Sequence, residues 1–197
     1  MGRASAKGPS VRSLASWFVS LSVLLGFVVP PATAAEPPPV GSYELGLQSG
    51  YFFGMTNNSQ SVTFLPRLGR VMWTDAGARP GAITFGIEGL FTRFFESNEA
   101  MELGGGPMLR YWMVRDGIEP YVEVGVGMLY SDLKHFSLGS RILFEADGAV
   151  GVQLPFWERF AASAGYRFRH ISNAGQSPSN PGLNGNIFAI GLSYLFY

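Results

Sequence analysis

The most constraining feature of this sequence is a period of two. From Ser42 to the C-terminus, apolar residues alternate with polar or small residues in one segment after another. Successive side chains of a β-strand point to opposite faces, so the alternation predicts strands with one apolar face and one polar face. In the first segment, Tyr43, Leu45 and Leu47 share a face, and Glu44 lies on the other. Eight such segments are expected, at residues 43–53, 61–73, 83–92, 101–111, 121–130, 142–154, 157–170 and 186–197.

The number of segments and the composition both favour an all-β barrel. Glycine supplies 26 of the 197 residues, and abundant glycine suits short strands that curve and close. Outer-membrane barrels of a single chain have an even number of antiparallel strands, each crossing the bilayer in roughly 9–11 residues. No segment after the N-terminal region is apolar enough for a membrane-spanning helix. The predicted fold is therefore an eight-stranded antiparallel transmembrane β-barrel.

Two kinds of barrel fit this pattern. A soluble, lipocalin-like barrel turns its apolar faces inward, whereas a membrane barrel turns them to lipid and fills its lumen with charged and small residues. The polar faces hold enough charge for an interior network of ion pairs: Glu44, Glu88, Glu102, Arg110, Glu123, Glu145, Asp147, Arg167 and Arg169. The chain also ends on Tyr197, and a terminal aromatic resembles the assembly signal of outer-membrane barrels. We expect the membrane barrel, but the last segment is apolar on both faces, so its orientation stays open at this stage.

The N-terminus is typical of a secreted protein. Residues 1–34 combine a basic start, an apolar stretch and Ala32-Thr33-Ala34, an A-x-A cleavage site, so we expect a signal peptide rather than the alternative, an uncleaved membrane anchor. Residues 35–41 form an extended, proline-rich leader, and residues 42–197 form the barrel. With both ends in the periplasm, the connections near 54–60, 95–100, 132–140 and 171–185 face outward. The connections near 74–80, 116–119 and 155–156 face the periplasm.

Composition excludes several classes of function. Lysine plus arginine equals aspartate plus glutamate at 14 each, so a basic face for nucleic acid is not expected. The chain has no cysteine, which excludes disulfides, a thiolate nucleophile and cysteine-ligated metals. It has only two histidines, His135 and His170, so a multi-histidine metal site is also excluded. We expect no metal or other cofactor.

One stretch has residues suited to catalysis as well as to a barrel wall. His170 is in phase with the apolar side chains of its segment, and so is Ser172 if the strand continues, whereas Arg167 and Arg169 face the lumen. Residues two apart on a strand share a face at roughly 6.5–7 Å. A serine becomes a nucleophile beside a base that is itself held in place, and asparagine amides or loop N–H groups can stabilise the oxyanion. The plainer interpretation of this stretch is an ordinary polar loop.

The second histidine lies in a different connection. His135 is interpreted as a solvated residue of an outer loop. Lys134 and Arg141 flank the same loop, and they serve either to solubilise it or to contact the phosphates of a lipid headgroup.

The run His170-Ile171-Ser172-Asn173-Ala174-Gly175, followed by Asn180 and Gly182, resembles the PagL family of lipid A 3-O-deacylases. The resemblance implies an outer-membrane barrel that hydrolyses the 3-position acyl ester of lipid A in lipopolysaccharide, without a metal. It implies Ser172 as nucleophile and His170 as general base. It also implies Asn180 as the oxyanion-binding residue, with the Gly175 N–H and with Asn173 shaping the site. A homodimer in the membrane is a further implication of the resemblance.

The sequence departs from the family at one catalytic position. The glutamate of the family's Ser-His-Glu triad falls on Asn184, and no carboxylate lies between His170 and the C-terminus. An asparagine can hold the histidine in one tautomer, but it cannot stabilise an imidazolium by charge. Two hypotheses follow. One is a carboxylic ester hydrolase with weakened activity that uses His170, Ser172 and Asn184. The alternative is a non-catalytic structural or adhesive barrel that has kept a degraded triad.

Overall fold

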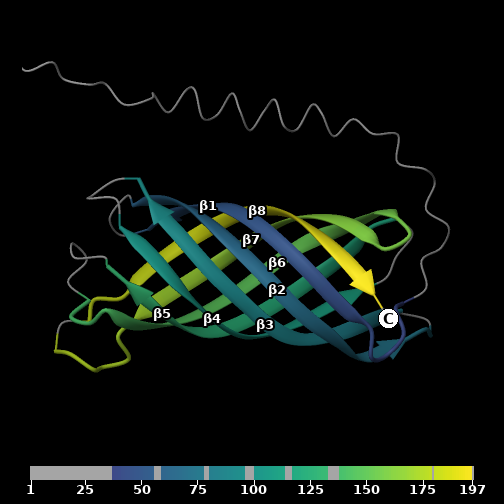
Figure 1. The fold of residues 1–197 in the computed structure, drawn as a ribbon, viewed down its shortest axis with the longest axis horizontal. Helices are drawn as coiled ribbons and strands as arrows, with labels where there is room; N and C mark the ends of the chain where they lie inside the picture. Colours follow the sequence, from purple (N-terminus) through teal and green to yellow (C-terminus); the bar gives the residue numbers. More distant parts are fainter. Residues whose placement is uncertain are drawn as a thin grey trace, which may run out of the picture. The chain divides into compact units, whose positions relative to one another are not determined.

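The computed structural model is a closed barrel of eight antiparallel strands (Figure 1). It describes residues 37–55, 59–77, 80–95, 100–113, 117–132, 138–178 and 180–196. The predicted signal peptide, His135, Lys134 and Tyr197 lie outside these residues. The strands are β1 (Tyr43–Gly54), β2 (Gln60–Asp75), β3 (Gly81–Phe94), β4 (Met101–Met113), β5 (Glu119–Ser131), β6 (Ile142–Trp157), β7 (Phe160–Ser172) and β8 (Leu183–Phe196).

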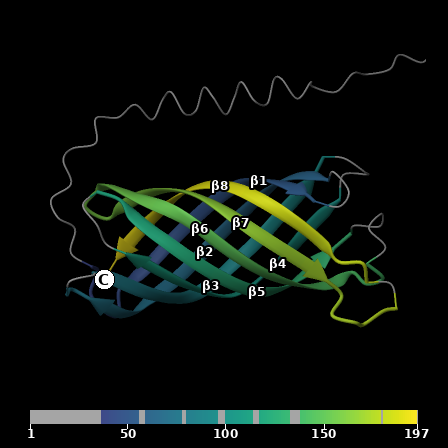
Figure 2. The ribbon, with the colours of Figure 1, turned by 180° about the vertical axis from the view of Figure 1, so that it is seen from behind.

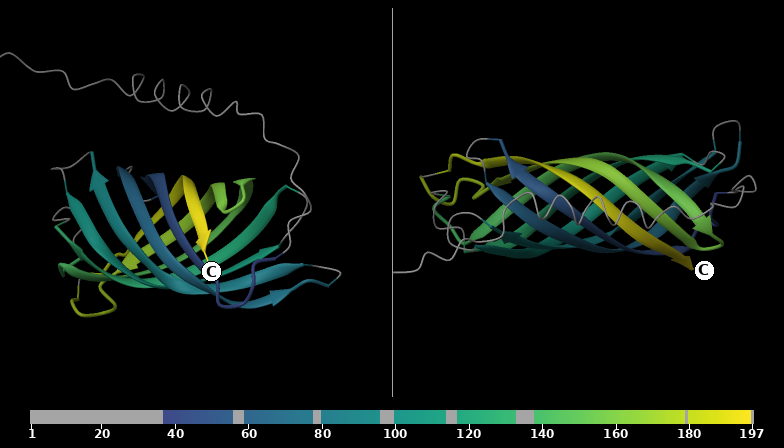
Figure 3. Two further views of the ribbon diagram at one scale, coloured as in Figure 1. Left: turned by 45° about the vertical axis from the view of Figure 1, so that its right-hand side comes forward. Right: turned by 90° about the horizontal axis from the view of Figure 1, so that it is seen from above.

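Each strand pairs with the next one along the chain, and β1 pairs with β8 to close the barrel (Figure 2). Tyr43 at the start of β1 lies opposite Phe196 at the end of β8, so both termini of the barrel are at one end. The end opposite these termini, where β7 finishes at Ser172, is called the outer end below. The strands cross the barrel obliquely (Figure 3). The described residues include no helix of the length and hydropathy needed to span a membrane.

The predicted faces are confirmed, because the apolar side chains point away from the lumen. Leu45, Ile87 and Val124, for example, are more than half exposed on the outer wall. The lipocalin-like alternative is therefore wrong. The orientation of β8 is also decided: Phe188 and Leu192 are exposed on the outer wall. The lumen side of β8 carries Leu183, Ile187, Ala189 and Ser193, all buried.

The lumen contains the predicted ion-pair network. Arg110 contacts Glu44 at 3.2 Å and also pairs with Glu123. Arg167 lies 3.0 Å from Asp147 and pairs with Glu88 and Glu123 as well. Nearer the outer end, Arg169 contacts Glu102 at 2.7 Å and Glu145 at 2.6 Å. Charges buried in this way persist because each is paired with opposite charges.

Apolar side chains fill the lumen on both sides of this network. At the outer end they are Phe52, Phe94, Ala100, Leu129, Leu138, Leu143, Ile171, Leu183, Ile187 and Ala189. Toward the termini they are Val71, Ala82, Trp112 and Tyr121, with Leu195 packed against them. Eight strands leave an interior just wide enough for side chains. The lumen is therefore a packed core without room for a substrate. A substrate can reach the outer wall or the rim of the barrel.

The connection before β7 differs from the prediction. A turn at 155–156 was expected, but β6 continues to Trp157, with an irregularity of register between Pro155 and Trp157. The chain reverses at Glu158 and Arg159, and β7 begins at Phe160. A proline at an irregular pair loses little, because its missing N–H is not needed there.

Candidate active site

The first component of the site is a cross-strand pair on the outer wall, near the outer end. His170 of β7 lies directly opposite Asn184 of β8. Nδ1 of His170 and Oδ1 of Asn184 are 2.7 Å apart. An amide oxygen only accepts hydrogen bonds, so Nδ1 carries the proton and donates it. The other ring nitrogen, Nε2, is then unprotonated in the neutral imidazole and can act as a base.

Ser172 shares this face of β7. It is the last residue of the strand and lies one two-residue step beyond His170, and both are half-buried. The N–H of Ala174 donates to Ser172 Oγ over 3.4 Å. Among the described residues, Ser172 and His170 are not hydrogen-bonded to each other, so the hydroxyl has to turn toward Nε2 before it can be deprotonated. The alternation along this segment predicts that both side chains lie on the outer wall, and the structure has them there.

A compact turn after β7 holds three other predicted site residues together. The buried Asn173 donates its backbone N–H to Asn180 Oδ1 at 3.0 Å. Its side chain donates to the carbonyl of Leu138 at 2.7 Å and accepts from the N–H of Gly175 at 2.8 Å. Asn173 therefore binds the loop to the β5–β6 connection. Gly175 uses its N–H within the turn, whereas the Nδ2 group of the exposed Asn180 is free of this network.

The turn also positions a residue that sequence reasoning missed. Ala174 adopts a positive φ of 50°, which is uncommon outside glycine. Backbone conformations of this kind gather at functional sites, where surrounding contacts enforce them. Here the Asn173 contacts enforce the turn, and the Ala174 N–H is directed at the Ser172 hydroxyl. The sequence signal is the Asn-Ala-Gly run, which is typical of a tight turn but gives no direction for the N–H.

Gly182 packs against the imidazole. A Cβ built on this glycine would meet His170 Cε1 at 3.0 Å, and its φ of 67° lies in the left-handed region. A side chain at this position would therefore press on the ring while straining the backbone.

We expect Gly182→Ala to lower the free energy of unfolding by about 1–2 kcal/mol and to displace the His170 ring. Urea unfolding in detergent micelles measures the stability, and the imidazole resonances measure the ring position. Gly148→Ala is the matched control, because a Cβ there meets only the Glu123 carbonyl oxygen at 3.9 Å. Unchanged His170 resonances in Gly182→Ala would contradict the packing role.

The carboxylates near β7 serve the lumen rather than this site. Glu145 is bound to Arg169, and Asp147 lies against Arg167. Glu158 is in the turn before β7, at the far end of the strand from His170. Within the described ranges, no group of three His, Cys, Asp or Glu side chains is arranged to hold a metal ion. Arg141 donates to the Tyr130 hydroxyl at 3.1 Å at the outer rim.

Comparison with known proteins gives one family and several solved structures with a similar fold. The family model described as lipid A 3-O-deacylase (PagL) matches residues 43–193. The crystal structure of the outer membrane enzyme PagL is similar with a TM-score of 0.62 and 20% identity, covering 75% of this chain and 97% of that one. Neisserial surface protein A gives a TM-score of 0.52 and 12% identity, with coverages of 78% and 98%. These likenesses support the eight-stranded barrel. The search of curated proteins returned no match.

Proposed function

The chain belongs to the PagL family of lipid A 3-O-deacylases, and from this we propose that it hydrolyses the 3-position acyl ester of lipid A with Ser172 as nucleophile. Family and fold place it in the bacterial outer membrane. The observation that carries the proposal is the bond between His170 and Asn184 on the wall that faces lipid, with Ser172 on the same face. Polar side chains on that face are costly unless they contact headgroups or substrate.

The proposed reaction is a two-step acyl transfer. His170 Nε2 takes the proton of the Ser172 hydroxyl as Oγ attacks the ester carbonyl. The tetrahedral oxyanion collapses to an acyl-serine ester, and the departing sugar oxygen takes the proton from His170. Water, deprotonated by the same nitrogen, then hydrolyses the acyl-serine to a free fatty acid and restores the serine. The substrate stays in the outer leaflet throughout.

Two donors are available for the oxyanion. Asn180 Nδ2 is one, because Asn180 Oδ1 accepts from Asn173 and, within the described residues, Nδ2 makes no hydrogen bond in the turn. The Ala174 N–H is the other, because it already points at Ser172 Oγ. We assign it this role in place of the Gly175 N–H, which is bound to Asn173 Oδ1. Donors fixed in advance by a turn stabilise a developing charge without reorganisation.

Mass spectrometry of lipid A from cells that express this chain tests the function. We expect a mass loss of one acyl group at the 3-position, and lipid A from cells without the chain provides the comparison. Extraction of the folded barrel with the outer membrane confirms that the protein is in place. Unchanged lipid A alongside a correctly inserted barrel would favour the alternative, a structural or adhesive barrel with a degraded triad.

A further inference from the structure

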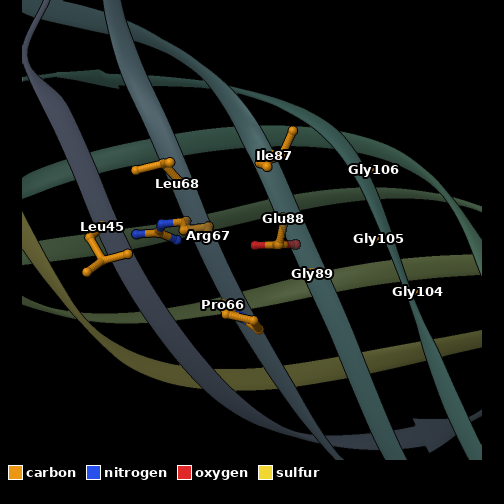
Figure 4. Close-up of a pocket in the computed structure, with 10 residues that line it drawn as sticks. All are labelled: Leu45, Pro66, Arg67, Leu68, Ile87, Glu88, Gly89, Gly104, Gly105 and Gly106. Atoms are coloured by element: carbon orange, nitrogen blue, oxygen red, sulfur yellow. The ribbon is translucent and has the colours of Figure 1, made fainter.

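A hollow of about 510 Å³ opens in the wall formed by β1 to β4 (Figure 4). Leu45, Leu68 and Ile87 frame it with exposed apolar side chains. Pro66, Arg67 and Glu88 also line it, together with Gly89 of β3 and the consecutive glycines of β4, Gly104, Gly105 and Gly106 (Figure 4). None of the residues proposed for ester hydrolysis borders it.

The hollow exists because this part of the wall has four glycines, which carry no side chain, and a break in the pairing of β2 with β3. The pairing of β2 with β3 passes from Phe64–Phe91 directly to Arg67–Glu88, across Pro66, which has no N–H to donate. Gly89 and Gly105 lie opposite each other on the outer face. A Cβ on Gly105 would meet the Glu88 carbonyl oxygen at 2.3 Å, so the backbones approach here as only glycine permits.

The register connects this hollow to the candidate nucleophile. One row of paired residues runs from Gly89 to Gly105, then to Met128, Phe144 and Ser172. Ser172 ends β7 at the outer end, Phe144 lies just inside the outer end of β6, and Gly89 lies near the middle of β3. The row therefore descends from the rim into the part of the wall that faces hydrocarbon. Strands are spaced by about 4.8 Å, so Gly105 lies about 14 Å from Ser172 along the row.

We infer that the hollow receives the distal part of the acyl chain whose ester lies at Ser172, an inference that rests on the proposed function. An extended chain of about 12 carbons covers the 14 Å between the two points. It would cross Phe144 and Met128, and the flexible Met128 side chain is 57% exposed on this path. The hollow then favours esters whose chains are long enough to fill it.

The electrostatics of the hollow favour hydrocarbon over a charged headgroup. Its two charged residues are committed to the lumen: Arg67 contacts Glu44 at 2.8 Å, and Glu88 contacts Arg167 at 2.5 Å. The Arg67 side chain is 2% exposed and that of Glu88 is 10% exposed. The rim is apolar and faces the acyl chains of the membrane. A flexible hydrocarbon chain can fill such a space. The acyl chain whose ester lies at Ser172 is close enough to reach it.

Photo-crosslinking tests the location without requiring turnover. The probe is a 12-carbon 3-O-acyl ester of lipid A with a diazirine at the chain terminus, and the protein is the full barrel with Ser172→Ala. We expect mass spectrometry to find the label on β2, β3 and β4 around Gly89. Label spread evenly over the outer wall, or crosslinked pairs of barrels instead of lipid adducts, would overturn the inference. Because Ser172→Ala cannot turn over by the proposed route, the label reports where the chain binds and does not require hydrolysis.

Filling the hollow tests its effect on selectivity. Gly89→Leu points into it, and the new Cβ meets only Pro66 Cγ closely, at 3.2 Å. We expect the ratio of kcat/KM for 14-carbon over 8-carbon esters to fall about 5-fold, because the long chain loses its packing partners. Gly148→Leu, an outer-wall control away from the row, should keep the wild-type ratio. Equal ratios in wild type and Gly89→Leu would overturn the inference, and a wild type inactive on both esters would instead refute the proposed function.

Discussion

Ser172→Ala is expected to reduce the rate of lipid A deacylation by at least about 10³-fold. The substitution removes the only atom that the proposed mechanism uses to form the acyl-enzyme ester, while His170, Asn184 and the turn at Asn173 stay in place. Serine hydrolases that lose their nucleophile keep only the contribution of oxyanion donors and substrate binding. The measurement is kcat/KM on purified lipid A in detergent micelles, with fatty acid release followed by mass spectrometry.

The control must separate lost chemistry from lost structure. Ser49 is a half-buried serine on the outer wall of β1, so Ser49→Ala makes the same chemical change away from the site. Both variants should show the heat-dependent gel migration of a folded barrel, and Ser49→Ala should keep full activity. His170→Ala should match Ser172→Ala, and the double variant should be no slower, because members of a catalytic unit are not additive. Deacylation at the wild-type rate by Ser172→Ala would refute the role of the serine.

The alternation of apolar and polar residues predicts most of the barrel from the sequence. In strands with one polar and one apolar face, such as Tyr43–Gly54, the alternation alone assigns each residue to one of the two faces. β8 is the exception, because Ile187 and Phe188 are equally apolar and only its pairing with β1 and β7 assigns them to opposite faces. The turn before β7 also differs from the predicted 155–156, because Pro155 lies at an irregular pair within β6 and the chain reverses at Glu158 and Arg159.

Some features of the site also follow from the local sequence, and others depend on how the strands pair. The shared face of His170 and Ser172 follows from a spacing of two along one strand. The bond from His170 to Asn184 depends on the register of β7 against β8, and a shift of one residue would turn Asn184 to the lumen. The role of Asn173 depends on Leu138, which is distant in sequence. The hollow at Gly89 needs the register of four strands at once and has no local signature.

Asn184→Glu is expected to raise kcat/KM for deacylation by about 10²-fold. Asn184 Oδ1 already fixes the proton on His170 Nδ1, so Nε2 is correctly disposed as a base. The missing contribution is charge: an imidazolium forms as Ser172 is deprotonated, and an amide does not stabilise it as a carboxylate does. Hydrogen bonds to charged groups contribute about 1.5–3 kcal/mol in proteins. Most of that benefit should be realised in the transition state, when the imidazole becomes charged.

Two further variants at this position separate charge from geometry. Asn184→Asp keeps the length of the side chain and adds only the charge, so it should also exceed wild type. Asn184→Leu removes the acceptor, frees the imidazole to take either tautomer, and should reduce kcat/KM by about 10-fold or more. The order Glu and Asp above Asn, with Leu lowest, would establish Asn184 as the weakened third member of a triad. If Asn184→Glu were no faster than wild type while the Ser172→Ala loss held, another group would have to stabilise the imidazolium. If no variant showed hydrolysis, the arrangement of His170, Asn184 and Ser172 would belong to a barrel without this activity.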